Sequence, residues 1–209
     1  TGKLVEAQAI LKKCGYGLTC AVLNASLCGA PQRRKRFFMI GHLNDEDGFM
    51  SNVLEERQSK KEMTVADYFG NQLDIQYYYR HPRSYVRRGI FSVNEPSPTI
   101  RGVNRPIPAG YKLHSNDPVQ SLEGVRPLTT LERSMIQTFP KTFKFLESKT
   151  GMEQMIGNAV PVNLAKFVGD SIMNYLGIDN SVSYEQVREE YPNEIVNHTE
   201  IQVNPNNYS

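Results

Sequence analysis

The sequence Pro31-Gln32-Arg33-Arg34-Lys35-Arg36-Phe37-Phe38-Met39-Ile40 places four consecutive cations directly before an apolar run. Adjacent like charges repel, so solvent or an anionic or electron-rich partner has to relieve them. The apolar run predicts a buried strand over residues 37–40. Because alternate residues of an extended segment point the same way, Gln32, Arg34 and Arg36 are expected on one face. The alternative interpretation is a solvated basic loop that precedes a strand.

Length and composition favour an ordinary globular protein. The chain has 209 residues, of which 39% are hydrophobic, and this suits one core with a small second lobe. No run approaches the ~18–20 apolar residues that span a bilayer, and no signal-peptide pattern is present, so we expect no membrane contact. The cysteines are odd in number and lack metal-ligand spacing, which predicts reduced thiols in an intracellular protein.

The small net charge of +2 hides a division along the chain. Residues 178–209 hold six acids and one arginine, whereas residues 1–177 carry a net charge of +7. Within that part, residues 76–113 hold seven cations against one acid, Glu95. Such a basic segment predicts a polyanionic partner.

Periodicity and capping signals predict the main elements. Apolar spacing indicates helices over residues 3–13 and from about 162 to 176, and a strand over residues 18–23. Thr129 with Glu132 three residues later resembles a capping box that opens another helix, which Phe139-Pro140 ends. The segment from 68 to 113 is rich in Tyr, Arg, Pro and Gly, and predicts short strands and loops.

Four segments together resemble motifs of the DNA cytosine-5 methyltransferases. They are Gln32 to Arg36, Pro96-Ser97-Pro98-Thr99-Ile100, Arg126 to Pro140, and Gln154-Met155-Ile156-Gly157-Asn158-Ala159-Val160-Pro161. The resemblance implies an α/β fold: the C-terminal half of a Rossmann-like methyltransferase domain dependent on S-adenosylmethionine, with a small, irregular, β-rich target recognition lobe. It divides the chain into catalytic segments at 1–43 and 126–177, a recognition lobe at 44–125 and an acidic tail at 178–209.

The resemblance also implies roles for particular residues. Arg34 and Arg36, with Gln32, would line the pocket of a cytosine flipped out of duplex DNA, where a fixed guanidinium stabilises charge that develops on the ring oxygen. Asn158, Ala159 and Val160 would contact S-adenosylmethionine, the methyl donor. No metal is expected, because His42, His81, His114 and His198 show no ligand spacing.

Arginine forks read guanine in the major groove and asparagine can read adenine, so the recognition lobe offers candidates for DNA contact. We expect Arg101, Asn104 and Arg105 to read bases. A second set could read bases or position phosphates: Arg80, Arg83, Arg87 and Arg88.

The chain lacks two features of the family, a Pro-Cys nucleophile and a glycine-rich cofactor loop: Lys13, Thr19 and Leu27 precede its three cysteines. The resemblance therefore predicts the C-terminal part of a DNA cytosine-5 methyltransferase (EC 2.1.1.37) of a restriction-modification system, inactive alone. An N-terminal half, as a partner chain or a missing segment, would supply the cysteine. The bacterial cytoplasm or nucleoid is the expected location.

Two alternatives remain open. The first is a non-catalytic DNA-binding subunit, because Leu131 and Met135 stand where the family usually carries arginines. The second is a tRNA-directed relative that uses the same chemistry, although the arginine-rich lobe favours duplex DNA.

Overall fold

The computed structural model describes residues 2–84 and 86–178, so most of the expected acidic tail lies outside the described residues. The elements follow in the order α1 (Gly2–Lys13), β1 (Tyr16–Asn24), η1 (Ala25–Leu27), β2 (Gln32–Arg33), β3 (Lys35–Leu43), α2 (Ser51–Arg57), α3 (Val65–Phe69), η2 (Gly70–Gln72), β4 (Tyr77–Tyr79), β5 (Ile90–Ser92), β6 (Ser97–Pro98), β7 (Arg126–Pro127), α4 (Thr130–Ile136), α5 (Lys149–Asn158) and α6 (Val162–Tyr175). The labels η1 and η2 denote short 3-10 helices. After α1, the described part of the chain holds both helices and strands, grouped as β1 to β3, then α2 and α3, then β4 to β7, then α4 to α6.

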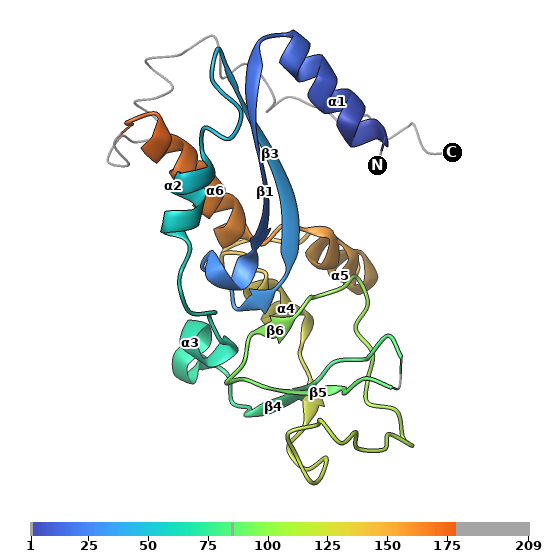
Figure 1. Ribbon diagram of the computed structural model, residues 1–209. Helices are drawn as coiled ribbons and strands as arrows, with labels where there is room; N and C mark the ends of the chain where they lie inside the picture. Colours follow the sequence, from blue (N-terminus) through green and yellow to red (C-terminus); the bar gives the residue numbers. More distant parts are fainter. Residues whose placement is uncertain (1, 85, 179–209) are drawn as a thin grey trace.

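The two longest strands, β1 and β3, form an antiparallel ribbon in which Val22 pairs with Phe37 and Leu23 with Arg36. Helices α2 and α6 lie on one side of this ribbon and α1 lies beside the other (Figure 1). Leu23 faces α6 and is buried, whereas Val22 and Phe37 on the opposite face are 62% and 45% exposed. The expected buried strand over residues 37–40 is thus part of a longer strand with one open face.

Two hydrophobic clusters organise the described residues. The first joins the ribbon to α2 and α6 through Leu23, Met50, Leu54, Leu164 and Val168. The second joins the three-stranded sheet β5-β4-β7 to α3, α4 and α5, with these buried members: Val65, Phe69, Tyr78, Phe91, Ile100, Leu128, Ile136 and Ile156. The short strands expected between residues 68 and 113 are therefore present, as β4, β5 and β6.

Strands β2 and β6 connect the two clusters in a short parallel pair, with Gln32 opposite Ser97. The Ser97 amide donates to the Pro31 carbonyl at 2.8 Å, and the Thr99 hydroxyl donates to the Arg33 carbonyl at 2.9 Å. The basic stretch of residues 33–36 therefore lies at the junction between the ribbon and β6.

The expected helices are confirmed as α1, α4 and α6, and α4 begins with the predicted capping box between Thr129 and Glu132. Helix α5 was not predicted, because Gly151 and Gly157 lower its helix propensity. Within the described residues, no helix combines the length and the apolar composition that a membrane span requires.

The described strand pairings are not, by themselves, those of a Rossmann-like sheet. A Rossmann-like sheet is built from parallel strands joined by helical crossovers. Among the described residues the longest pairing, β1 with β3, is antiparallel, and the parallel contacts are the short β2–β6 and β4–β7 pairs. Sequence periodicity locates a strand but does not fix the direction of its neighbour.

Candidate nucleic-acid interface

Arg34 is buried at the junction between the two clusters. Its side chain is 2% exposed, and its Nη1 and Nη2 donate to the carbonyls of Ile100 and Gly157, each at 2.8 Å. Burial, with a smaller contribution from nearby Arg36, lowers the pKa of Arg34 to about 10, which still leaves it cationic at neutral pH. Arg34 therefore holds the main chain at Ile100 against the end of α5.

Gln32 is also fully buried and both ends of its amide are used. Its Oε1 accepts from the Ile100 amide at 2.8 Å, and its Nε2 donates to Gln137 Oε1 at 3.0 Å. The predicted alternation holds, because Gln32 and Arg34 are buried whereas Arg33 and Lys35 are exposed. Neither buried side chain opens to solvent, so of the three predicted pocket residues Arg36 is the one with partial exposure.

Arg33 pairs with Glu62 and so does not project freely toward solvent. Its Nη2 lies 2.6 Å from Glu62 Oε2, and its Nε lies 3.0 and 2.9 Å from the two carboxylate oxygens. The Arg33 hydrogen bonds, helped by those from Ser26 and Asn24, lower the pKa of Glu62 to about 2. Arg33 also lines the cleft described next.

An arginine-lined cleft of about 790 Å³ is formed mainly by residues between 80 and 116, together with Arg33. Phe91, Pro98 and Thr99 contribute to its wall, and Glu95 is the acid among its lining residues. Its arginines include five of the seven predicted DNA-contact residues together with Arg33; they are Arg33, Arg80, Arg83, Arg87, Arg88 and Arg101. The two other predicted residues, Asn104 and Arg105, line a separate cleft of about 800 Å³ beside α4 and α5.

The cleft arginines are close enough to repel one another. Burial and then the neighbouring Arg101 lower the pKa of Arg80 to about 10. Burial, followed by Arg83 and Arg105, also lowers the pKa of Arg101. An anion placed among these cations relieves that repulsion, so the cleft is electrostatically suited to a phosphate backbone.

Some of these arginines also have partners within the protein. Arg80 Nη2 donates to the Thr99 carbonyl at 2.8 Å, and Arg88 forms an ion pair with Glu95 while its guanidinium lies 4.4 Å from the centre of the Phe91 ring. Such contacts fix where a guanidinium lies before any ligand arrives. They leave further N–H donors available on the same side chains.

Asp117 shapes the loops on one side of the cleft, and the sequence analysis missed it. Its carboxylate accepts from the amides of Gly89, Ile90 and His114 at 2.8 to 3.1 Å and from the Tyr111 hydroxyl at 2.7 Å. Burial opposes ionisation, but these hydrogen bonds together lower the pKa of Asp117. No local motif signals this role, since the donors come from residues up to 28 positions away.

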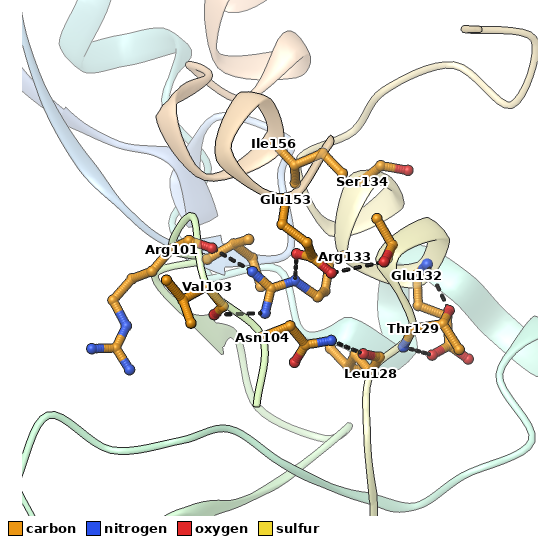
Figure 2. Close-up of polar contacts among 12 residues, drawn as sticks. Arg101, Val103, Asn104, Leu128, Thr129, Glu132, Arg133, Ser134, Glu153 and Ile156 are labelled. Atoms are coloured by element: carbon orange, nitrogen blue, oxygen red, sulfur yellow. Dashed lines mark hydrogen bonds and ion pairs between the residues drawn. The ribbon is translucent and has the colours of Figure 1, made fainter. Parts of the chain in front are cut away.

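Arg133 and Glu153 are a second feature that the sequence analysis missed. Both side chains are 6% exposed, and Arg133 Nε lies 2.8 Å from Glu153 Oε2 (Figure 2). The contact lacks the alignment of a hydrogen bond, so charge attraction holds it. Arg133 also donates to the main-chain carbonyls of Arg101 and Val103. The nearby Asn104 amide donates to the Leu128 carbonyl at 2.7 Å, so its nitrogen is occupied by the fold.

The predicted cofactor residues lie at the turn between α5 and α6. Asn158 ends α5 and is exposed, Ala159 is half-buried, and Val160 is 39% exposed. A small residue between exposed neighbours leaves room for a ligand to approach the main chain. In the part of the chain that the structure describes, no three His, Cys, Asp or Glu side chains gather in a group that could hold a metal ion.

Comparison with known proteins identifies the family. A family model described as C-5 cytosine-specific DNA methylase matches residues 4–174. Two type II methyltransferases are similar to this chain: M.HindV of Haemophilus influenzae, 64% identical over 77% of the chain, and M.HgiDI of Herpetosiphon aurantiacus, 59% identical over 82%. The matches cover 53% and 55% of those proteins, so the chain spans about half the length of the curated relatives it matches.

The fold is also similar to a solved structure of the same broad class. The S. pombe Dnmt2 methyltransferase superposes with a TM-score of 0.55 at 14% identity, over 85% of this chain and 64% of that one. At this identity the likeness concerns the fold alone. It supports an α/β methyltransferase architecture for the described elements.

These comparisons correct the expected place of the chain within its family. The missing Pro-Cys pair and glycine-rich loop suggested a C-terminal half, but the matched residues 4–174 correspond to the N-terminal portion of M.HindV and M.HgiDI. A motif that a segment lacks does not locate that segment in a longer chain, which is why the expectation failed. Membership itself is established by the extent of the match: the chain belongs to the family of C-5 cytosine-specific DNA methylases.

Proposed function

We propose that this chain binds duplex DNA and a flipped cytosine as part of a type II DNA cytosine-5 methyltransferase. The observation that carries the proposal is the junction between β2 and β6, which places the arginine-lined cleft beside the segment that ends in Arg36. A cleft of this kind binds the phosphate backbone, and the partly exposed Arg36 is available to a base that leaves the duplex.

In the reaction, a cysteine thiolate adds to C6 of the flipped cytosine and negative charge develops on the ring oxygen and N3. S-adenosylmethionine would supply the methyl group to C5 and would leave as S-adenosylhomocysteine. Removal of the C5 proton then expels the thiolate and restores the ring. The role of Arg36 is to stabilise the developing charge, while Arg34, two residues earlier, is held by the carbonyls of Ile100 and Gly157.

The thiolate comes from outside this chain. None of Cys14, Cys20 and Cys28 follows a proline, and Cys28 is buried with its pKa raised by burial to about 12. A thiol that stays protonated at neutral pH is a poor nucleophile. A second segment of the enzyme, with the Pro-Cys motif and the glycine-rich cofactor loop, therefore completes the site.

The open face of the β1–β3 ribbon fits that second segment. Cys20, Val22 and Phe37 are exposed on this face, and α1 beside it presents Val5 and Ile10 to solvent. Exposed apolar patches of this kind mark protein interfaces. The Asn158–Val160 turn then forms one wall of the S-adenosylmethionine site, and the second segment forms the other.

The test is methyl transfer from labelled S-adenosylmethionine to cytosine-containing duplexes, with the chain alone and with a segment of a relative that carries the Pro-Cys motif. We expect DNA binding by the chain alone and turnover only in the mixture. Turnover by the chain alone contradicts an external nucleophile. Absence of both binding and turnover contradicts the proposed function.

The second candidate is a DNA-binding subunit without a catalytic role, and the lack of a Pro-Cys pair favours it. Arg36→Ala in the mixture separates the two. A cytosine-pocket role predicts a large loss of turnover with DNA affinity nearly unchanged, whereas a binding role predicts weaker, less salt-dependent binding. Arg87→Ala in the cleft is the matched control, with the opposite expectation.

The substrate is either duplex DNA or tRNA. We propose that it is bacterial duplex DNA, in the cytoplasm or nucleoid. The arginine-lined cleft supports it, because guanidinium forks suit the major groove of B-form DNA. Competition of a labelled duplex with unlabelled tRNA tests the choice. Displacement by tRNA at concentrations where unlabelled duplex has no effect favours the tRNA-directed alternative.

A further inference from the structure

We infer that Arg133 is a specificity-positioning residue: held by Glu153, it fixes the main chain of residues 101–103 and thereby sets where the Arg101 side chain enters the arginine-lined cleft. The inference rests on the proposed role in DNA recognition. It concerns Arg133 and Glu153, for which the sequence alone predicts no role.

Each of the three nitrogens of the Arg133 guanidinium faces a different neighbour. Its Nε faces Glu153 at 2.8 Å, its Nη1 donates to the Val103 carbonyl at 3.3 Å, and its Nη2 donates to the Arg101 carbonyl (Figure 2). The group is planar and rigid, so these contacts fix the carboxylate and two main-chain carbonyls relative to one another. A lysine ammonium cannot reproduce that arrangement.

Glu153 is fixed in turn. Its Oε1 accepts from the Thr130 hydroxyl at 2.7 Å, so the carboxylate on α5 is held by the first turn of α4 as well as by Arg133. Burying an ion pair costs desolvation energy that often cancels its attraction, so such a pair is a weak source of stability. A role in fixing geometry accounts for its presence better than a role in stability.

The same segment is confined from its other side. A Cβ added to Gly157 would lie 2.1 Å from the Gly102 amide nitrogen and 2.4 Å from the Arg101 carbonyl carbon. Arg34 holds the preceding carbonyl, that of Ile100. The main chain from 100 to 103 therefore lies between two buried guanidinium groups and the end of α5.

The contacts described above hold the main chain of Arg101 and leave its side chain outside them. It extends away from Arg133 (Figure 2), lines the arginine-lined cleft and donates to the His81 carbonyl, which leaves other N–H groups for a base or phosphate. Because a bidentate base contact needs precise placement, a shift of the main chain at 101 would abolish discrimination before it abolished affinity.

The experiment selects preferred sequences from a random duplex library with the full 209-residue chain, then compares affinity for a preferred and a scrambled duplex. The test variant is the double substitution Arg133→Met with Glu153→Met, which removes both buried charges together. We expect the ratio of the two affinities to fall about 5- to 150-fold, the range one bidentate contact supplies, while affinity for the scrambled duplex stays within about twofold.

A double-mutant cycle with Arg101→Ala distinguishes positioning from a general structural role. If Arg133 acts through Arg101, the double substitution changes the ratio no further once Arg101 is alanine. The matched control is Lys166→Met with Asp170→Met, an ion pair on α6 that should leave the ratio unchanged. If the test variant fails to fold, Glu153→Gln keeps the shape, weakens the pair and should show a smaller loss in the same direction.

The outcomes separate the two claims. A chain with no sequence preference overturns the proposed recognition role and this inference with it. A chain that selects a sequence, together with a test variant that keeps the full ratio, overturns only the inference. Additive losses in the Arg101→Ala background overturn it as well.

Discussion

Gln32 and Gln137 share a hydrogen bond of 3.0 Å between Nε2 and Oε1, although 105 positions separate them in the sequence. Gln137 Nε2 continues the chain of contacts to the Ile156 carbonyl at 2.5 Å. Both glutamines are fully buried, so every polar atom of this link is removed from water. The link connects β2, α4 and α5 at the point where the two hydrophobic clusters meet.

Gln137→Leu should therefore destabilise the chain. The substitution leaves Gln32 Nε2 and the Ile156 carbonyl without their partner, and each buried group left unpaired costs about 1–3 kcal/mol. Urea unfolding measures the loss as a lower midpoint at unchanged slope. Gln154→Leu, at an exposed position of α5, is the control. Equal midpoints for the two variants contradict the proposed importance of the link.

Gly157→Ala should be more damaging than its size suggests. The added methyl would lie 2.1 Å from the Gly102 nitrogen. Both contacting groups are main chain, so the contact can be relieved only if α5 moves away from residues 101–102. Overpacking of this kind costs about 1–3 kcal/mol or more.

The control for Gly157 is Gly169→Ala in α6, where no neighbouring atom lies within 4 Å of the new methyl. Alanine favours a helix interior over glycine, so this variant should gain about 0.5–1 kcal/mol. Thermal unfolding of both variants gives the comparison. A Gly157→Ala midpoint at or above the wild-type value would show that the contact is looser than described.

Acid should weaken the Arg33–Glu62 pair. Since the folded pKa of Glu62 is lowered to about 2 from an ordinary value of 4.5, its contribution is complete above about pH 4.5 and is lost as the pH falls toward 2. Arg33 is 54% exposed, so solvent screening limits the effect to about 1 kcal/mol.

Glu62→Gln should accordingly reduce the change in the free energy of unfolding between pH 4.5 and pH 2. Glu56→Gln, at an exposed position of α2, provides the comparison. Chemical unfolding at half-unit pH steps measures the slopes. If the free energy of unfolding of Glu62→Gln changes with pH as steeply as that of the wild type, another carboxylate causes the acid sensitivity.

Thiol reactivity should divide the three cysteines. Cys14 and Cys20 are exposed, whereas Cys28 is buried and its raised pKa keeps it protonated, so a thiol reagent at pH 8 should modify two groups in the folded chain and three after unfolding. Cys28→Ser should leave the folded count at two.

Cys20 also reports on the open face of the ribbon. If a second segment of the enzyme covers that face, its addition should slow modification of Cys20 several-fold. Mass spectrometry of the labelled peptides assigns each site. Unchanged reactivity of Cys20 in an active mixture would place the interface elsewhere.

Local patterns predicted those parts of the structure that depend on neighbouring residues. The capping box of Thr129 and Glu132 spans three positions, and the helix it opens is present. The strands β1 and β3 follow from short apolar runs, and the clustering of most candidate DNA contacts follows from the charge of residues 76–113. Each of these signals lies within one segment of the chain.

The remaining features depend on partners far apart in sequence. The burial of Arg34 depends on carbonyls 66 and 123 positions away, so a cationic run that appears solvated in the sequence contains a structural side chain. The Arg133–Glu153 pair likewise lies across two helices, one of which was not predicted. Pairings of this kind are fixed by the packing of distant elements.

The acceptors held by Arg34 and Arg133 are main-chain carbonyls, those of Ile100, Arg101, Val103 and Gly157. Every amino acid carries a main-chain carbonyl, so these bonds to residues 100–103 do not depend on the side chains at those positions. Substitutions at 101 and 103 can accumulate while the anchoring bonds persist. The anchoring of residues 100–103 and the identity of the side chains they carry are thus physically independent.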